Sequence, residues 1–173
     1  MSFEPTEFEW RQPKATERAY ELTSGEKEFG RLRFEKSSGS LASGSTGNHH
    51  WTFKRSGFLS PRVTVRESGS EIDLASFVPT WTGSGWLQFS SGKRYHLRST
   101  NFWSTEWSFE DESGNRVVSL TGPHGLFKHG GHAAVASSFT GQPETLVMLL
   151  LIWYLRVLMN EDASAVAVIA TVG

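Results

Sequence analysis

Residues 146–155 read LVMLLLIWYL, ten consecutive apolar side chains with no polar interruption. The sequence GQPE at 141–144 precedes this run, and Arg156 follows it. Leucine and methionine favour a helix over a strand, proline suits the first helical position, and glutamate suits the positive end of the helix dipole. The pattern predicts an α-helix over about 143–160, roughly 27 Å long at about 1.5 Å per residue.

This helix has no polar face. Ten successive residues make about 2.8 turns, so apolar side chains point in every direction around the axis. Such a helix must be surrounded by lipid or by protein. A bilayer span needs about 20 predominantly apolar residues, whereas this run reaches a charge at Arg156. We therefore expect protein to surround the helix and the chain not to be an integral membrane protein, with a membrane anchor as the weaker alternative.

The part of the chain before the helix is divided by eight Ser-Gly pairs. Glycine reaches positive φ without steric cost and serine bonds locally to the backbone, so such pairs mark turns. Closely spaced turns indicate many short strands in sequence order, which form an antiparallel meander. The pairs lie at 24–25, 38–39, 43–44, 56–57, 68–69, 84–85, 91–92 and 113–114.

Apolar and polar residues alternate along the segments between these turns. Leu32 and Phe34 alternate with arginines, and Val63 and Val65 alternate with Arg and Thr. Period-two alternation places the apolar side chains on one face of a strand and the charged ones on the other. We count about ten to twelve strands over about 8–138, and a sheet of that length tends to close because closure removes its exposed edges.

The predicted fold class is therefore mainly β with a C-terminal helix: a closed antiparallel barrel of about 10–12 strands around a central hydrophobic α-helix. An eight-stranded barrel is filled by its own side chains, so a wider ring is needed to admit a helix about 10 Å across. We expect a single domain over 1–173. Asn160-Glu161-Asp162 is expected to end the helix. Within the short apolar tail 161–173, the segment from Ala163 to Val172 is expected to form a second short helix.

This layout resembles the tubby C-terminal-like superfamily, which includes the LURP-one-related proteins and the phospholipid scramblases. The resemblance covers about 15–160 and depends on the strand meander and on the segment LLLIWYLR at 149–156. It implies a barrel of roughly twelve strands that closes around a hydrophobic helix near the chain end. Tubby domains bind phosphoinositides through basic side chains, but no residue of this chain can be matched to those positions.

Composition excludes several classes of function. The 17 Lys and Arg and 18 Asp and Glu give a formal net charge of −1, so we expect no nucleic-acid partner. The chain has no cysteine, which rules out disulfides and thiol chemistry. Residues 1–30 show no apolar segment behind a basic leader, so we expect a cytoplasmic protein, with peripheral attachment to a membrane left open.

Three histidines lie within nine residues: His124, His129 and His132. Three imidazoles could bind zinc or nickel if the loop folded back on itself. Neighbouring glycines and the absence of a nearby acidic residue in the sequence favour a flexible turn instead, because a metal-bound histidine usually needs an orienting acceptor. A metal site remains the alternative, and we expect no cofactor.

Basic residues on the predicted outer faces of the strands form a candidate anion patch. If the strands are neighbours, the patch could receive phosphate groups through charge-assisted hydrogen bonds. The simpler interpretation is a solvated outer wall whose charge is balanced by glutamates. The candidate residues are Lys54, Arg62, Arg66, Arg94, His96 and Arg98.

The sequence contains no phosphate-binding loop, nucleophile elbow or metalloprotease helix, so no residue is assigned a catalytic role. We expect a non-enzymatic binding or scaffold domain whose partner is an anionic phospholipid surface or another protein. A histidine-based metalloprotein or enzyme is the first alternative, and a carrier of a small hydrophobic ligand is the second. A helix that fills the barrel argues against the carrier.

Overall fold

The computed structural model describes residues 6–80, 83–99, 106–122 and 130–172. It consists of twelve strands, a short 3-10 helix and one long α-helix. The strands are β1 (Glu7–Arg11), β2 (Ala19–Ser24), β3 (Lys27–Phe34), β4 (Ala42–Thr46), β5 (His49–Ser56), β6 (Arg62–Glu67), β7 (Ala75–Pro79), β8 (Gly85–Phe89), β9 (Arg94–Ser99), β10 (Glu106–Asp111), β11 (Arg116–Thr121) and β12 (Gly130–Val135). The helices are η1 (Ser137–Phe139) and α1 (Pro143–Val172).

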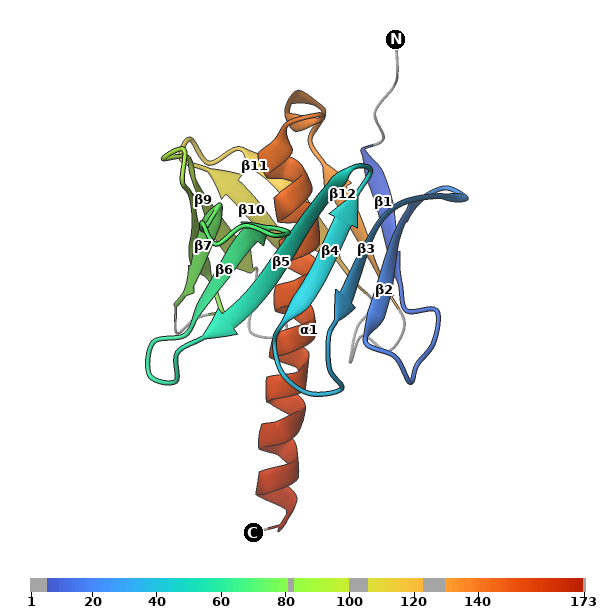
Figure 1. Cartoon of the computed structure of the whole chain (residues 1–173), viewed down its shortest axis with the longest axis vertical. Helices are drawn as coiled ribbons and strands as arrows, with labels where there is room; N and C mark the ends of the chain where they lie inside the picture. The colour runs from blue at the N-terminus through green and yellow to red at the C-terminus, as the bar shows by residue number, and fades with distance from the viewer. Residues whose placement is uncertain (1–5, 81–82, 100–105, 123–129, 173) are drawn as a thin grey trace.

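The strands form one closed antiparallel barrel in which each strand pairs with its neighbours in the sequence. The first and last strands close the ring, with Phe8 opposite Ala133 and Trp10 opposite Gly131. The helix α1 runs through the barrel and extends beyond one end of it (Figure 1). The predicted fold class, a barrel of ten to twelve strands around a C-terminal helix, is confirmed.

The apolar positions of the strands face the helix, as the alternation predicts. Leu32, Phe53, Val65 and Phe109 are fully buried, and their neighbours along each strand are exposed or half-buried, except the buried Ser108. On α1, every residue from Val147 to Leu155 is buried. The helix therefore forms the centre of the core, because no other arrangement in water would cover its apolar side chains on all sides.

The tightest approach between helix and strands occurs at glycines. A Cβ at Gly44 in β4 would lie 2.9 Å from Leu150 Cδ1, and one at Gly131 in β12 would lie 2.9 Å from Trp153 Cζ3. The Ser43-Gly44 pair therefore lies in the middle of a strand, and its assignment to a turn is wrong. Glycine is present here because it leaves room for the helix, a common reason for glycine inside a strand.

The helix begins at Pro143, as predicted, but does not end at Asn160. One continuous helix of 30 residues replaces the two helices expected from the sequence. Aspartate and glutamate lower helix propensity only slightly, so they end a helix only where a turn is also favoured. From Glu161 to Val172 every residue is exposed. The uncharged part of this segment, Ala163 to Val172, which we call the tail, projects from the barrel (Figure 1).

No helix in the described part of the chain carries an apolar stretch long enough to cross a bilayer.

Candidate functional site

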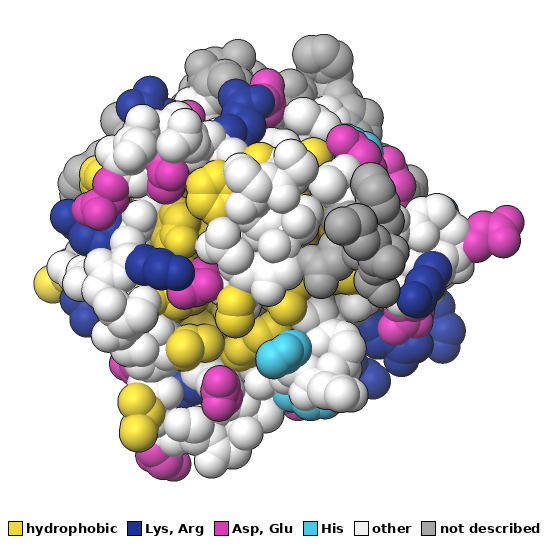
Figure 2. All heavy atoms as spheres, turned by 90° about the horizontal axis from the view of Figure 1, so that it is seen from above, with side chains coloured by type: hydrophobic (Ala, Val, Ile, Leu, Met, Phe, Trp, Pro, Cys, Tyr) yellow, Lys and Arg dark blue, Asp and Glu magenta, His cyan; other side chains and the backbone are white. Residues whose placement is uncertain are grey.

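The end of the barrel at which α1 leaves it carries exposed apolar side chains and two arginine–carboxylate pairs. We call it the exit end. It is formed by the turns that follow β1, β3 and β5 and by the tail (Figure 1). The opposite end, shown in Figure 2, carries charged side chains of both signs around a central area with apolar side chains.

Two arginines hold α1 where it leaves the barrel. Arg18 donates from Nε and Nη2 to the two carboxylate oxygens of Glu161, at 2.8 and 2.7 Å. Arg55 donates from Nη1 and Nη2 to the carboxylate of Asp162, at 2.5 and 3.1 Å. Both pairs are bidentate, the geometry that fixes direction as well as distance. We call these four side chains the collar.

The collar is itself supported from behind. Arg18 also donates to the carbonyl oxygens of Lys36 and Gly39, at 2.8 and 3.0 Å, and its guanidinium lies 4.0 Å from the centre of the Phe34 ring. Its side chain is 13% exposed, so it is almost enclosed by these partners. These contacts therefore hold Arg18 in position for its pair with Glu161.

Tyr154 connects the core to the same region. Its hydroxyl donates to the carbonyl oxygen of Ser40 at 2.6 Å, and the Ser40 hydroxyl donates to the carbonyl oxygen of Arg55 at 2.9 Å. Burial raises the pKa of Tyr154 to about 12. The phenol therefore stays protonated as a donor, and the turn after β3 is tied both to α1 and to the collar.

The turn between β5 and β6 exposes two large apolar side chains. Phe58 is 97% exposed and Leu59 is 89% exposed, and both lie at the exit end because β5 runs toward it. Gly57 has φ +89°, which only glycine adopts without strain, so the turn is built to project these residues. Single exposed apolar residues are common, whereas adjacent ones at the end of the barrel from which an apolar helix projects are candidates for an interaction surface.

The tail has no charged residue after Asp162 and no polar face. Its large side chains Val166, Val168, Ile169 and Val172 are all more than half exposed. Its hydroxyls bond back to the helix: Ser164 donates to the Asn160 carbonyl at 2.9 Å, and Thr171 lies 2.9 Å from the Val168 carbonyl. The surface of the tail is therefore apolar on all sides, with its hydroxyls satisfied internally.

The candidate anion patch divides into two groups. Three of its members lie on β5 and β6, and the other three lie on β9, with β7 and β8 between them. Because neighbouring strands lie about 4.8 Å apart, β6 and β9 are roughly 14 Å apart along the sheet. The structure does not bring the six residues into one cluster, and their role in anion binding stays a prediction.

Carboxylates accompany several of these basic side chains. Trp86 lies next to two of the basic side chains. The Arg94 guanidinium carbon is 4.7 Å from the centre of a Trp86 ring, and the centres of the Trp86 and His96 rings are 4.5 Å apart. Burial lowers the pKa of His96, and Arg98 lowers it further, so this imidazole favours its neutral form. The ion pairs are Arg66–Asp73 at 2.6 Å, Arg98–Glu110 at 3.0 Å and Arg94–Glu112 at 4.0 Å.

Of the three candidate metal ligands, His124 and His129 lie outside the described residues. His132 lies in β12, at the seam that closes the barrel, opposite Glu9 in β1. Its Nδ1 is 2.7 Å from the Glu9 carboxylate, and its Nε2 contacts Glu7. The acceptors that the sequence lacks nearby are thus supplied by β1. Within 6–80, 83–99, 106–122 and 130–172, no group of three or more His, Asp or Glu side chains could hold a metal ion.

The His132 contacts make the closing seam sensitive to pH. The hydrogen bond with Glu9 raises the pKa of His132, and Glu7 raises it further, so the folded state favours the charged imidazole. This stabilisation is complete below the ordinary histidine pKa of about 6.5 and is lost as the pH rises through the raised value. Because His132 is 44% exposed, we expect less than about 1 kcal/mol.

A His132→Gln variant tests this expectation. Urea unfolding of both proteins should show the largest difference in free energy of unfolding near about pH 5.5 and little difference near about pH 8.5. A His96→Gln variant serves as the control, because the pKa of His96 is lowered and its folded state favours the neutral ring. A constant His132→Gln difference over this range would contradict the assigned ion pairs.

Comparisons with family models, with curated proteins and with solved structures found no match for this chain. The exit end was not identified from the sequence. Its signals were an uncharged segment after Asp162 and the Phe58-Leu59 pair beside a Ser-Gly turn. Each is unremarkable alone, and only the barrel brings them to the same end.

Proposed function

We propose that this protein is a non-enzymatic docking domain that attaches reversibly to a lipid surface by inserting the tail of α1 and the Phe58-Leu59 turn. The observation that carries the proposal is the exposed, uncharged tail that continues from the core helix. A short helix of alanine and valine is only marginally stable in water without tertiary packing. An apolar surrounding would therefore stabilise the tail, and the described residues do not supply one.

The distribution of apolar side chains favours lipid over a protein partner. A helix that docks in a protein groove presents one apolar stripe and keeps a polar face toward water. The tail has no polar face, and its two hydroxyls bond to its own backbone. A uniform apolar medium covers such a surface equally on all sides, which a groove does not. From Ala163 to Val172 the tail is about 15 Å long, roughly half of a 30 Å hydrocarbon core.

The size of the apolar surface fits reversible attachment. Among the described residues of the exit end, six large apolar side chains are more than half exposed: Phe58, Leu59, Val166, Val168, Ile169 and Val172. At about 1.5 kcal/mol each, their burial contributes on the order of 9 kcal/mol before the entropic cost of binding. A single myristoyl chain contributes a similar amount and gives marginal, reversible membrane binding. Peripheral attachment of a cytoplasmic protein is part of this proposal.

The charge of the collar is balanced, because both of its arginines already pair with carboxylates. Insertion of apolar side chains should therefore govern binding, with little contribution from lipid charge. This distinguishes docking by the tail from docking by the basic outer wall, which would need anionic lipid and would weaken with salt.

Vesicle flotation tests the proposal. We expect the protein to float with neutral phosphatidylcholine vesicles and to remain bound at about 0.5 M salt. Ile169→Glu should reduce the bound fraction at least about tenfold, because it removes about 1.5–3 kcal/mol of apolar burial and adds a charge. Binding that requires anionic lipid and disappears with salt would contradict docking by the tail.

The chain offers a matched control for this substitution. Ile72 is 77% exposed and Ile169 is 74% exposed, but Ile72 lies between β6 and β7, at the opposite end of the barrel. Ile72→Glu should therefore leave flotation unchanged. Equal losses for the two variants would mean that general surface hydrophobicity governs binding, which would overturn the proposal.

We also propose the tubby C-terminal-like superfamily as the structural relative of this chain. A closed barrel of twelve antiparallel strands around an apolar helix supports the relationship.

A further inference from the structure

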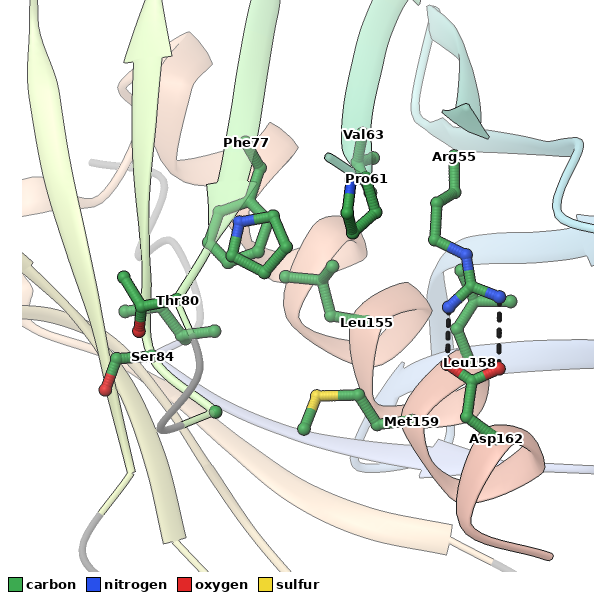
Figure 3. A pocket seen from close by; sticks show the side chains of 13 residues that line it. Arg55, Pro61, Val63, Phe77, Thr80, Ser84, Leu155, Leu158, Met159 and Asp162 are labelled. Carbon is green, nitrogen blue, oxygen red and sulfur yellow. Dashed lines mark hydrogen bonds and ion pairs between the residues drawn. The ribbon is translucent and has the colours of Figure 1, made fainter. Parts of the chain in front are cut away.

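A cleft opens beside α1 near the exit end, between the helix and strands β6, β7 and β9. Its volume is about 270 Å³. Figure 3 shows Leu155 and Met159 of α1 on one wall, with Phe77 and Pro61 facing them. The barrel is wide enough to admit the helix. On this side, the side chains of α1 do not fill the space between the helix and the strands.

The wall of the cleft is apolar. Val63, Phe77, Leu97 and Leu155 line it and are each at most 5% exposed, whereas Met159 at its mouth is 38% exposed. A cavity lined by aliphatic and aromatic side chains offers water few hydrogen bonds and accepts apolar guests. Because the volume lies below the usual range of about 300–1,000 Å³ for drug-sized ligands, it suits one narrow chain better than a fused ring system.

A bidentate ion pair lies at the rim of the cleft. Among the described residues that line it, Arg55 and Asp162 carry charge, and they pair with each other (Figure 3). The Asp162 side chain is 54% exposed and Arg55 is 34% exposed, so the carboxylate can turn toward water more easily than the guanidinium. An anionic oxygen on a ligand can then replace Asp162 as the acceptor of Arg55.

We infer that the cleft binds one amphiphilic molecule, a single acyl chain whose head group carries an anionic oxygen. The chain lies along Phe77 and Leu155, and Arg55 donates hydrogen bonds to the head group in place of Asp162. The carboxylate of a fatty acid and the phosphate of a single-chain lysophospholipid share this chemistry. This inference goes beyond membrane docking and depends on different residues, since none of the six inserting side chains lines the cleft.

Methyl NMR of methionine can test this site in the full chain. The sequence has three methionines. Met159 lies at the mouth of the cleft, and Met148 is completely buried nearer the start of α1. Titration with decanoate should shift the Met159 methyl signal saturably and leave the Met148 signal unchanged. The neutral analogue 1-decanol should bind at least about tenfold more weakly, because it cannot form the charge-assisted pair. A decanoyl lysophosphatidic acid titration distinguishes the phosphate from the carboxylate source.

Two substitutions should change decanoate affinity in opposite directions. Arg55→Gln removes the cation and should weaken binding about tenfold or more, whereas Asp162→Asn removes the competing carboxylate and should strengthen it. Arg98→Gln is the control, because the Arg98–Glu110 pair lies outside the cleft. An unchanged Met148 signal in each variant shows that the core is intact.

Three results would overturn the inference: no saturable Met159 shift with either lipid, equal affinity for decanoate and 1-decanol, or a loss of affinity in Asp162→Asn as large as in Arg55→Gln. The Ile169→Glu variant separates this inference from membrane docking. It should lose flotation with vesicles and keep decanoate affinity, so failure of one proposal is distinguishable from failure of the other.

Discussion

Replacing Ile152 by aspartate is expected to abolish soluble folding. Ile152 is completely buried in the part of α1 that the barrel surrounds. The substitution removes about 1.5–3 kcal/mol of apolar burial and places an unpaired charge in a site without water, at a cost of several kcal/mol more. The total approaches the 5–15 kcal/mol by which a typical domain is stable. Soluble yield and the cooperative thermal transition are the measurements.

The same substitution at an exposed position provides the control. Ile72→Asp, at a residue that is 77% exposed, should change the free energy of unfolding by less than about 0.5 kcal/mol. If Ile152→Asp instead gave a monomeric protein with a cooperative transition, the helix could not occupy the centre of the barrel.

Replacing Gly44 by alanine is expected to destabilise the protein, because the added methyl group crowds the contact between β4 and α1. A Cβ at this position would lie 2.9 Å from Leu150 Cδ1 and 2.9 Å from Phe53 Cε2. The backbone of Gly44 does not have positive φ, so the cost comes from crowding alone. Gly44→Ala should destabilise the protein by about 1–3 kcal/mol in urea unfolding, the usual cost of overpacking a core.

A double-mutant cycle with Leu150→Ala isolates that contact. Leu150→Ala alone should cost about 2–5 kcal/mol, and Gly44→Ala should cost less in its presence because the vacated space accepts the added methyl. The coupling should be about 0.5–3 kcal/mol. As a control, Leu87→Ala on β8, four strands away, should combine additively with Gly44→Ala. Additivity of Gly44→Ala with Leu150→Ala would contradict the observed contact.

The architecture could be predicted because two strong periodic signals agree. The run at 146–155 leaves no face of the helix suited to contact with water. In the strands before it, apolar and polar residues alternate with period two, as Leu32 and Phe34 illustrate. Strands that bury one face and a helix that is buried on all sides are both accommodated when the strands form a closed barrel around the helix. Trp51, Trp107 and Trp153 are buried in the resulting core.

Two features could not be predicted because they depend on distant contacts. Gly44 resembles a turn residue in the sequence, and only the nearby Leu150 explains its place inside a strand. Glu161 and Asp162 resemble a helix end, but within the helix they pair with Arg18 and Arg55, which the sequence does not place near them. In both cases the partner lies more than a hundred residues away in the chain.

The candidate site was missed for a related reason. Sequence reasoning selected charged side chains on the outer wall, whereas the exposed apolar residues of the exit end, Phe58 and Ile169 among them, lie far apart in the sequence. Their shared position depends on the direction in which each strand and α1 cross the barrel (Figure 1).

The unbroken rod of α1 has a further consequence for orientation. If the tail enters a lipid layer, we expect the barrel axis to lie close to the membrane normal, because the barrel surrounds the preceding part of the same helix. The turn that pairs Lys93 with Glu144 would then face the aqueous phase, about 30 Å above the layer. In this orientation, the end of the barrel opposite the tail would be accessible to proteins in the aqueous phase.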